Sequence, residues 1–181
     1  STAFLKRFAL ALAGVGASRI LVVGLGKPSD IDGHAAEDIA ASAVGFLSRA
    51  GETAATFEID TPKGTKLKPG AFAAHLAMGA RLKSYAFNHY RTKDLADHES
   101  TLKKATIATS DAAGARKAWS ALEAAADGMY LARDLVNEPP NVLSPAEFAS
   151  RVKQLSKLGV KVEVLGEAQM HQLGMGALLG V

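Results

Sequence analysis

Short apolar runs alternate along the chain with longer segments whose apolar residues recur every three or four positions, which is typical of an α/β protein. Residues 19–24 (Arg-Ile-Leu-Val-Val-Gly) have the continuous aliphatic character of a strand buried on both faces of a parallel sheet. The Ala-rich residues 34–50 predict a helix with Ile39 and Phe46 on one side, and β character returns over 53–60. These segments predict a βαβ unit with a right-handed crossover.

The middle of the chain predicts a helix over 71–86, where Gly79 would allow close approach to a sheet, and a strand over 102–109. A helix from about residue 113 to 135 or 136 is the longest. Ser110-Asp111 lies where its cap should be. At 1.5 Å per residue this helix spans roughly 33 Å, which is long enough to connect two domains.

Residues 132–145 form a joint, because a long helical pattern ends there and two successive prolines, Pro139 and Pro140, make a rigid turn. Ser144, Pro145 and Glu147 then have the form of a helix start. That helix would stop near Gly159 and turn three apolar side chains inward: Phe148, Val152 and Leu155.

The two ends of the chain carry weaker patterns. Residues 4–13 predict a short helix, 160–165 a strand with one wetter side, 166–173 a short helix and 175–181 a buried strand. The helix–strand–helix–strand set after the joint should not be stable alone, since it leaves sheet edges and one face uncovered.

Composition limits the class of protein. The 181 residues are 48% hydrophobic and 22% charged, the values of an ordinary soluble globular chain, and no apolar run is long enough to span a bilayer. Zero cysteines exclude disulfides and Cys-ligated metals, and a cytoplasmic location is expected. The net charge of +3 is mildly basic, but only Lys63, Lys66 and Lys68 cluster, as expected for a solvated loop, so nucleic-acid binding is not expected.

Three groups of residues could carry chemistry. The glycine-rich turn of residues 24–29 (Gly-Leu-Gly-Lys-Pro-Ser) follows a strand, but it lacks the spacing of a dinucleotide or Walker motif, and an ordinary loop is favoured. Turn and cap roles are favoured over metal binding for Asp30, Asp32 and His34. The histidines have no metal-ligand spacing, and they are His34, His75, His89, His98 and His171.

The third group, Arg133, Asp134, Asn137 and Glu138, lies at the end of the long helix. Arg133 and Asn137 share a helix face at i, i+4, and the two carboxylates share the adjacent face. A role in capping the helix and fixing the joint is favoured over a direct part in catalysis.

A resemblance to a known family gives information on function that residue spacing does not give. Residues 132–145 (Ala-Arg-Asp-Leu-Val-Asn-Glu-Pro-Pro-Asn-Val-Leu-Ser-Pro), followed by 159–165 and 173–181, resemble the start of the catalytic domain in the leucyl (cytosol) aminopeptidases. Residues 22–27 and 85–93 are similar to parts of that family's macro-domain-like N-terminal region. The resemblance implies an α/β fold with a partial N-terminal domain over 1–111, a linking helix over 112–137 and an incomplete catalytic domain over 138–181.

The same resemblance implies a two-metal exopeptidase, usually a homohexamer, that removes N-terminal residues such as leucine from peptides with water activated by Zn²⁺ or Mn²⁺. The family's metal ligands lie in motifs resembling Gly-Lys-Gly-Ile-Thr-Phe-Asp-Ser-Gly-Gly and Asn-Thr-Asp-Ala-Glu-Gly-Arg, and neither occurs in these residues. The catalytic and metal-binding residues are therefore expected downstream of Val181, and the chain is expected to be an inactive fragment. Two alternatives stay open: a macro-type module that binds ADP-ribose through residues 24–29, and a non-catalytic DNA-binding paralogue.

Overall fold

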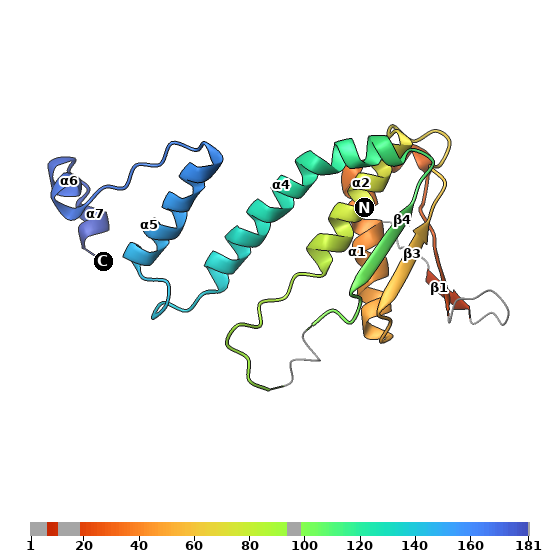
Figure 1. Cartoon of the computed structure of the whole chain (residues 1–181), viewed down its shortest axis with the longest axis horizontal. Coiled ribbons are helices and arrows are strands. Elements are labelled where there is room, and N and C mark those ends of the chain that lie inside the picture. The colour runs from red at the N-terminus through yellow and green to blue at the C-terminus, as the bar shows by residue number, and fades with distance from the viewer. Residues whose placement is uncertain (1–6, 11–18, 94–98, 181) are drawn as a thin grey trace. The chain divides into compact units, whose positions relative to one another are not determined.

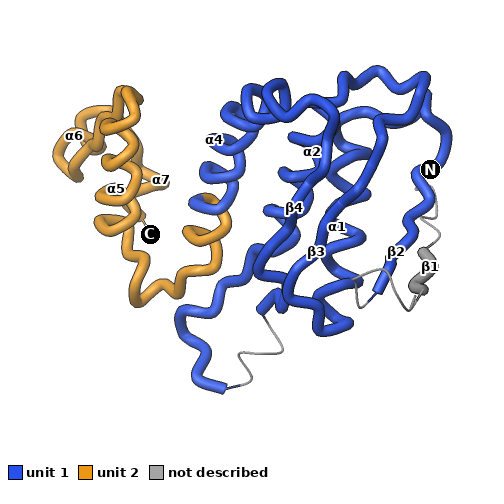
Figure 2. The backbone as a smooth tube through the Cα atoms, turned by 45° about the vertical axis from the view of Figure 1, so that its right-hand side comes forward, with its two compact units in different colours: residues 1–131 blue, residues 132–181 orange. Residues whose placement is uncertain are grey.

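The structure, a computed structural model, describes residues 7–10, 19–93 and 99–180 and consists of two compact units (Figure 2). Unit 1 covers residues 1–131 and unit 2 covers residues 132–181. Among the described residues all four strands lie in unit 1, whereas unit 2 contains only helices and connecting segments.

The strands of unit 1 form two separate pairs. β1 (Arg7–Leu10) and β2 (Ile20–Val23) are antiparallel, whereas β3 (Ala54–Glu58) and β4 (Lys104–Ala108) are parallel and in register from end to end. The helix α2 (Pro69–Lys83) lies between β3 and β4 in the sequence, so it is the crossover that parallel strands require.

The helices of unit 1 begin at residues suited to that position. The Asp32 carboxylate accepts a hydrogen bond from Ala35 N at 2.9 Å at the start of α1 (Gly33–Arg49), just after the 3-10 turn η1 (Pro28–Asp30). Asp111 does the same for Gly114 N at 2.8 Å at the start of α4 (Ala112–Asn137), as the sequence predicts. The predicted helix 34–50 and strands 53–60 and 102–109 are confirmed within a few residues.

The core of unit 1 is the contact between α1, α2 and one face of the β3–β4 pair (Figure 1). Phe72 and Leu76 of α2 are each 1% exposed, and Phe57 is the buried residue of β3. The remaining buried members are Ile31, Ala36, Ile39, Ala40, Ala43, Val44, Ala80 and Leu102. Because many of them are alanines, the two helices can approach more closely than bulkier residues would permit.

Gly79 marks the closest approach of the two helices. A Cβ atom at Gly79 would lie 2.0 Å from the carbonyl oxygen of Glu37 in α1, well inside van der Waals contact. The prediction that this glycine faces a sheet is therefore wrong, because its neighbour is the backbone of a helix.

Arg81 connects α2 to the first part of α4 within unit 1. Its guanidinium pairs with Asp127 and with Glu123 at 3.7 Å, and it lies 5.9 Å from the ring centroid of Trp119. The backbone carbonyl of Arg81 accepts a hydrogen bond from the Tyr130 hydroxyl. These contacts hold α4 beside α2 although Ala126 is the one buried residue recorded for the described part of that long helix.

Unit 2 contains four short helical elements after the end of α4: α5 (Pro145–Lys153), η2 (Gln154–Leu158), α6 (Glu167–Gln172) and α7 (Gly176–Leu179). Ser144 Oγ caps α5 by accepting from Glu147 N at 3.3 Å, and Pro145 occupies the first turn, as predicted. Gly159, with a φ of +86°, ends η2 where the sequence predicts the stop. No helix in the described ranges is both long and apolar enough to cross a membrane.

Two expectations for the first sixty residues are wrong. Within the predicted helix 4–13, residues 7–10 form the strand β1, and the other positions lie outside the described residues. Residues 19–24 do form a strand, but its partner among the described residues is the antiparallel β1, so the expected place in a parallel sheet is wrong. The predicted strand–helix–strand order is present as β2–α1–β3, without hydrogen bonds between the two strands. Periodicity reports the burial of a strand and carries no information on which strand pairs with it.

Three expectations for unit 2 are also wrong. Residues 160–165 form no strand, and residues 176–179 form the helix α7 in place of a buried strand. A strand needs a hydrogen-bonding neighbour, which the described part of unit 2 does not offer, and a short apolar run is compatible with either a strand or a helix. Phe148, expected to point inward, is 48% exposed.

Replacing Gly79 with Ala should destabilise unit 1, because the new methyl group forces α1 and α2 apart. We expect Gly79→Ala to lower the free energy of unfolding by about 1–3 kcal/mol in urea titrations followed by circular dichroism. Gly128→Ala is the matched control, since a Cβ at Gly128 in α4 meets nothing within 4 Å. It should raise stability by about 0.5–1 kcal/mol through helix propensity. Equal effects of the two substitutions would contradict the close approach.

Candidate functional site

The joint after α4 is held by backbone and side-chain hydrogen bonds within unit 2. Asn137 Nδ2 donates to the carbonyl of Arg133 at 2.8 Å, and Glu138 N donates to the carbonyl of Asp134 at 3.0 Å. Beyond them, the amides of residues 142 and 143 both donate to the carbonyl of Pro139 at 2.9 Å. These bonds satisfy carbonyl groups at the end of the helix and close the proline turn, which agrees with the structural role favoured from the sequence.

Arg151 of α5 reaches back to this turn. Its NH1 atom lies 2.9 Å from Glu138 Oε1, and its Nε lies 2.8 Å from Glu147 Oε1. Hydrogen bonds to the Glu147 and then the Glu138 carboxylate raise the pKa of Arg151, so the guanidinium is charged at any accessible pH. The contact with Glu138 spans thirteen residues, and sequence spacing gave no signal for it.

The two carboxylates that bind Arg151 differ in exposure, which makes them a matched pair. The Glu138 side chain is 6% exposed and that of Glu147 is 44% exposed. The Glu138 carboxylate is largely shielded from water, so its pair with Arg151 is screened less than the more exposed i, i+4 pair with Glu147, which contributes little.

Glu138→Gln should therefore loosen the start of α5 several times more than Glu147→Gln. The measurement is hydrogen–deuterium exchange of the amides of residues 146–153, which should speed up at least threefold in the first variant and stay near the wild-type rate in the second. Similar exchange in both variants would show that the Glu138 contact does not hold the turn.

The glycine-rich turn of residues 24–29 connects β2 to α1. Gly26 has a φ of +77°, and Ser29 Oγ donates to the Asp30 carboxylate at 3.0 Å. The Ala35 amide at the start of α1 is already bound by the Asp32 carboxylate, which also adds negative charge there. A phosphate would have to displace that carboxylate, so the geometry favours an ordinary strand-to-helix loop over a nucleotide site.

Asp32 gives this loop a pH dependence. The hydrogen bond from Ala35 N, with a smaller contribution from the charge of His34, lowers the pKa of Asp32 below its usual 3.8. A carboxyl whose folded pKa is lowered stabilises the fold above the unfolded pKa and loses that contribution as the pH falls through the folded pKa.

We expect the thermal midpoint of the wild type to exceed that of Asp32→Asn at pH 6 and the difference to shrink as the pH falls below about 3.8. Asp30→Asn, which removes a neighbouring exposed charge, is the control for net charge. A difference between wild type and Asp32→Asn that is constant from pH 6 to pH 3 would contradict the assignment.

The histidines do not assemble into one site. His75 Nδ1 lies 2.7 Å from Glu37 Oε1, and His34 Nδ1 lies 3.5 Å from the other oxygen of the same carboxylate. His89 packs against Phe87 with ring centroids 5.0 Å apart. His171 is exposed in α6, and His98 lies outside the described residues. The contact of Glu37 with His75 joins α1 to α2, and residue spacing does not predict it.

The described residues contain no metal-binding cluster. Among them, no three His, Asp or Glu side chains lie close enough together to hold an ion. Lys63, Lys66 and Lys68 are exposed on the loop before α2, as expected for solvated residues.

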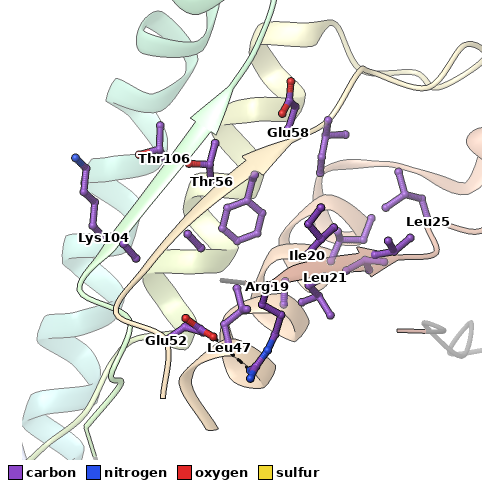
Figure 3. Close-up of a pocket in the computed structure, with 18 of the residues that line it drawn as sticks. Arg19, Ile20, Leu21, Leu25, Leu47, Glu52, Thr56, Glu58, Lys104 and Thr106 are labelled. Carbon is purple, nitrogen blue, oxygen red and sulfur yellow. Dashed lines mark ion pairs between the residues drawn. The ribbon is translucent and has the colours of Figure 1, made fainter. Parts of the chain in front are cut away.

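A cavity of about 1000 Å³ lies between β2 and β3, within unit 1 (Figure 3). Its walls are the two strands, and Leu47 of α1 contributes to its floor. Arg19 and Glu52 form an ion pair of 3.3 Å at its margin. The lining combines aliphatic side chains with polar and charged ones, among them Glu58, Asp60 and Lys104.

Two family models match this chain, one before the joint and one that includes it. Residues 7–94 match the N-terminal domain of the cytosol aminopeptidase family, and residues 130–181 match the catalytic domain of the same family. Together the two matches cover most of the chain and lie in the order expected from the sequence resemblance.

Relatives of known sequence agree. A probable cytosol aminopeptidase of Rhizobium leguminosarum bv. trifolii is 48% identical over 170 residues, which is 93% of this chain and 34% of the relative. A probable cytosol aminopeptidase of Agrobacterium fabrum is 45% identical over 174 residues, with 95% and 34% covered. The chain thus spans about a third of the length of the relatives it matches.

Solved structures show the same fold. The bottromycin maturation enzyme BotP in complex with Mn superposes with a TM-score of 0.71 at 28% identity, covering 93% of this chain and 34% of that chain. A mutant of tomato leucine aminopeptidase gives a TM-score of 0.74 at 24% identity, covering 93% and 33%. With both family domains matched in order, the chain belongs to the cytosol aminopeptidase family.

Proposed function

We propose that this sequence forms about a third of an aminopeptidase that removes N-terminal residues such as leucine from peptides. The observation that carries the proposal is the pair of family matches on either side of the joint, in the order N-terminal domain and then catalytic domain. Relatives at 45–49% identity named as probable cytosol aminopeptidases support it.

The proposed domain organisation is a partial N-terminal domain over 1–111, a linking helix over 112–137 and the beginning of the catalytic domain over 138–181. The bounds of α4, Ala112–Asn137, support the linking helix. The division into compact units between residues 131 and 132 supports a boundary inside that helix.

Two divalent ions, Zn²⁺ or Mn²⁺, are proposed for the whole enzyme, and the manganese named for BotP supports a metal-dependent reaction. Such ions polarise a scissile carbonyl and activate water when bound. The two family motifs expected to hold these ligands do not occur in these 181 residues, so we place the ligands elsewhere in the whole enzyme and assign no step to them.

The role proposed for this chain is therefore architectural. The Arg151 pairs fix the proline turn between the linking helix and α5. We expect the residues of the joint not to contact the metals. A cytoplasmic, homohexameric enzyme is the assembly we propose, supported by the cytosolic name of the relatives.

A chimera tests the function. The 170 matched residues of the Rhizobium leguminosarum relative are replaced by the corresponding part of this chain, and release of nitroaniline from leucine p-nitroanilide is measured with Mn²⁺ or Zn²⁺. We expect the chimera to keep at least a tenth of the activity of the relative, because the fold and both domain matches are shared.

The 181-residue chain alone is the matched control, and it should release no nitroaniline above the rate with metal alone. A chimera that is folded and binds metal but is inactive would count against the proposal. Saturable release by the isolated chain, abolished by a chelator, would overturn the placement of the metal ligands.

A further inference from the structure

The contact of α4 with α2 differs in kind from the contact of α1 with α2. The α1–α2 contact is closed by buried side chains such as Phe72 and Leu76, each 1% exposed. In the described range of α4, by contrast, Ala126 is the one buried residue. The part of α4 in unit 1 therefore lies beside α2 with little apolar packing to hold it there (Figure 2).

Arg81, in the last turn of α2, contacts four side chains of α4. Its guanidinium lies 5.9 Å from the ring centroid of Trp119 and 5.5 Å from that of Tyr130. The same group pairs with Asp127 and, at 3.7 Å, with Glu123. The four partners follow one another at intervals of four, four and three positions, so they share one face of the helix. Arg81 and these four residues are called the latch.

The ion pairs of the latch lie largely in water. The Glu123 side chain is 51% exposed, that of Asp127 is 62% exposed and that of Arg81 is 31% exposed. Ion pairs between exposed side chains contribute little and are screened by salt, and a cation–π contact is also weak where water reaches it. The latch should therefore weaken as ionic strength rises, whereas the apolar α1–α2 contact should not.

The start of α4 is held to α2 in another way. A Cβ atom at Gly70 would lie 2.6 Å from the backbone nitrogen of Ala115 and 2.6 Å from the carbonyl carbon of Gly114. The two helices therefore meet backbone to backbone at Gly70, which is buried. This crossing is called the pivot. At 1.5 Å per residue, about 18 Å of helix separates Ala115 at the pivot from Asp127 in the latch.

We infer that α4 is attached to unit 1 as a lever, pinned at the pivot near its start and held along α2 by the Arg81 latch. Opening of the latch releases residues 116–131 from α2, while the core of α1, α2, β3 and β4 stays folded. Such local opening is typical of segments with few buried apolar contacts. The same helix continues to Asn137 and carries the chain from unit 1 into unit 2. This inference does not depend on peptidase activity.

The single tryptophan of the chain reports the state of the latch, because Trp119 belongs to it. Acrylamide quenching of its fluorescence and hydrogen–deuterium exchange are measured on the 181-residue chain in about 0.05 M and about 1 M NaCl. We expect high salt to raise the quenching constant at least twofold. Exchange of residues 116–131 should speed up at least threefold, since an undocked helix is marginal in water, and exchange of residues 72–80 should stay near its low-salt rate.

Arg81→Gln removes the charge and the guanidinium plane, so it should show the high-salt behaviour already at low salt. Arg81→Lys keeps the charge without the plane that stacks on the two rings, and its quenching constant should be intermediate. Lys103→Gln is the matched control, because it removes an exposed ion pair of unit 1, with Glu99 at 3.2 Å, and should change neither readout. If Arg81→Gln unfolds the chain, as judged by circular dichroism, Asp127→Asn replaces it.

Two results would overturn the inference. One is exchange that speeds up equally at residues 72–80 and 116–131 in Arg81→Gln, because Arg81 would then stabilise unit 1 as a whole. The other is quenching and exchange that neither salt nor the substitution changes, because apolar contacts would then hold α4. No readout involves catalysis, so failure here is separate from failure of the proposed function.

Discussion

The contact between α1 and α2 is the constraint on which unit 1 depends. Gly79 lies against the carbonyl of Glu37 so closely that no side chain fits between them, and the surrounding alanines extend the contact along both helices. Phe72 and Leu76 can then cover Phe57 and close the core on one face of the β3–β4 pair. Close packing of small residues gains dispersion contacts and excludes water, which offsets the loss of large apolar side chains.

The joint depends on a different kind of interaction. None of the described residues of unit 2 is buried, so apolar packing contributes little to the joint. A charged hydrogen-bond network on Arg151 instead ties the proline turn to α5. Because that network is local, it can define the geometry at the start of a catalytic domain before the remainder of such a domain packs on it.

Unit 1 and unit 2 therefore differ in which of their surfaces lack a partner among the described residues. Unit 1 has a closed helix–helix contact but two strand edges that border one cavity. Unit 2 has capped helices and several exposed apolar side chains, among them Leu158 at 80% and Leu178 at 65% exposed. In both units, helices and turns form where capping residues and turn residues specify them. Strand edges and apolar side chains stay exposed where only a partner distant in sequence could cover them.

The sequence by itself determined the local elements and the family. Caps at Asp32, Asp111 and Ser144, the glycine stop at Gly159 and the Ala-rich helices follow from residue chemistry that acts over a few positions. The motif at the joint identified the family, because its order of residues is specific. Only the tertiary structure decided the antiparallel partner of β2, the approach of Gly79 to a helix, the Glu37–His75 contact and the helix at residues 176–179. The first three depend on atoms distant in sequence, and the last on the lack of a pairing strand among the described residues of unit 2. Periodicity encodes which face is buried but not what covers it.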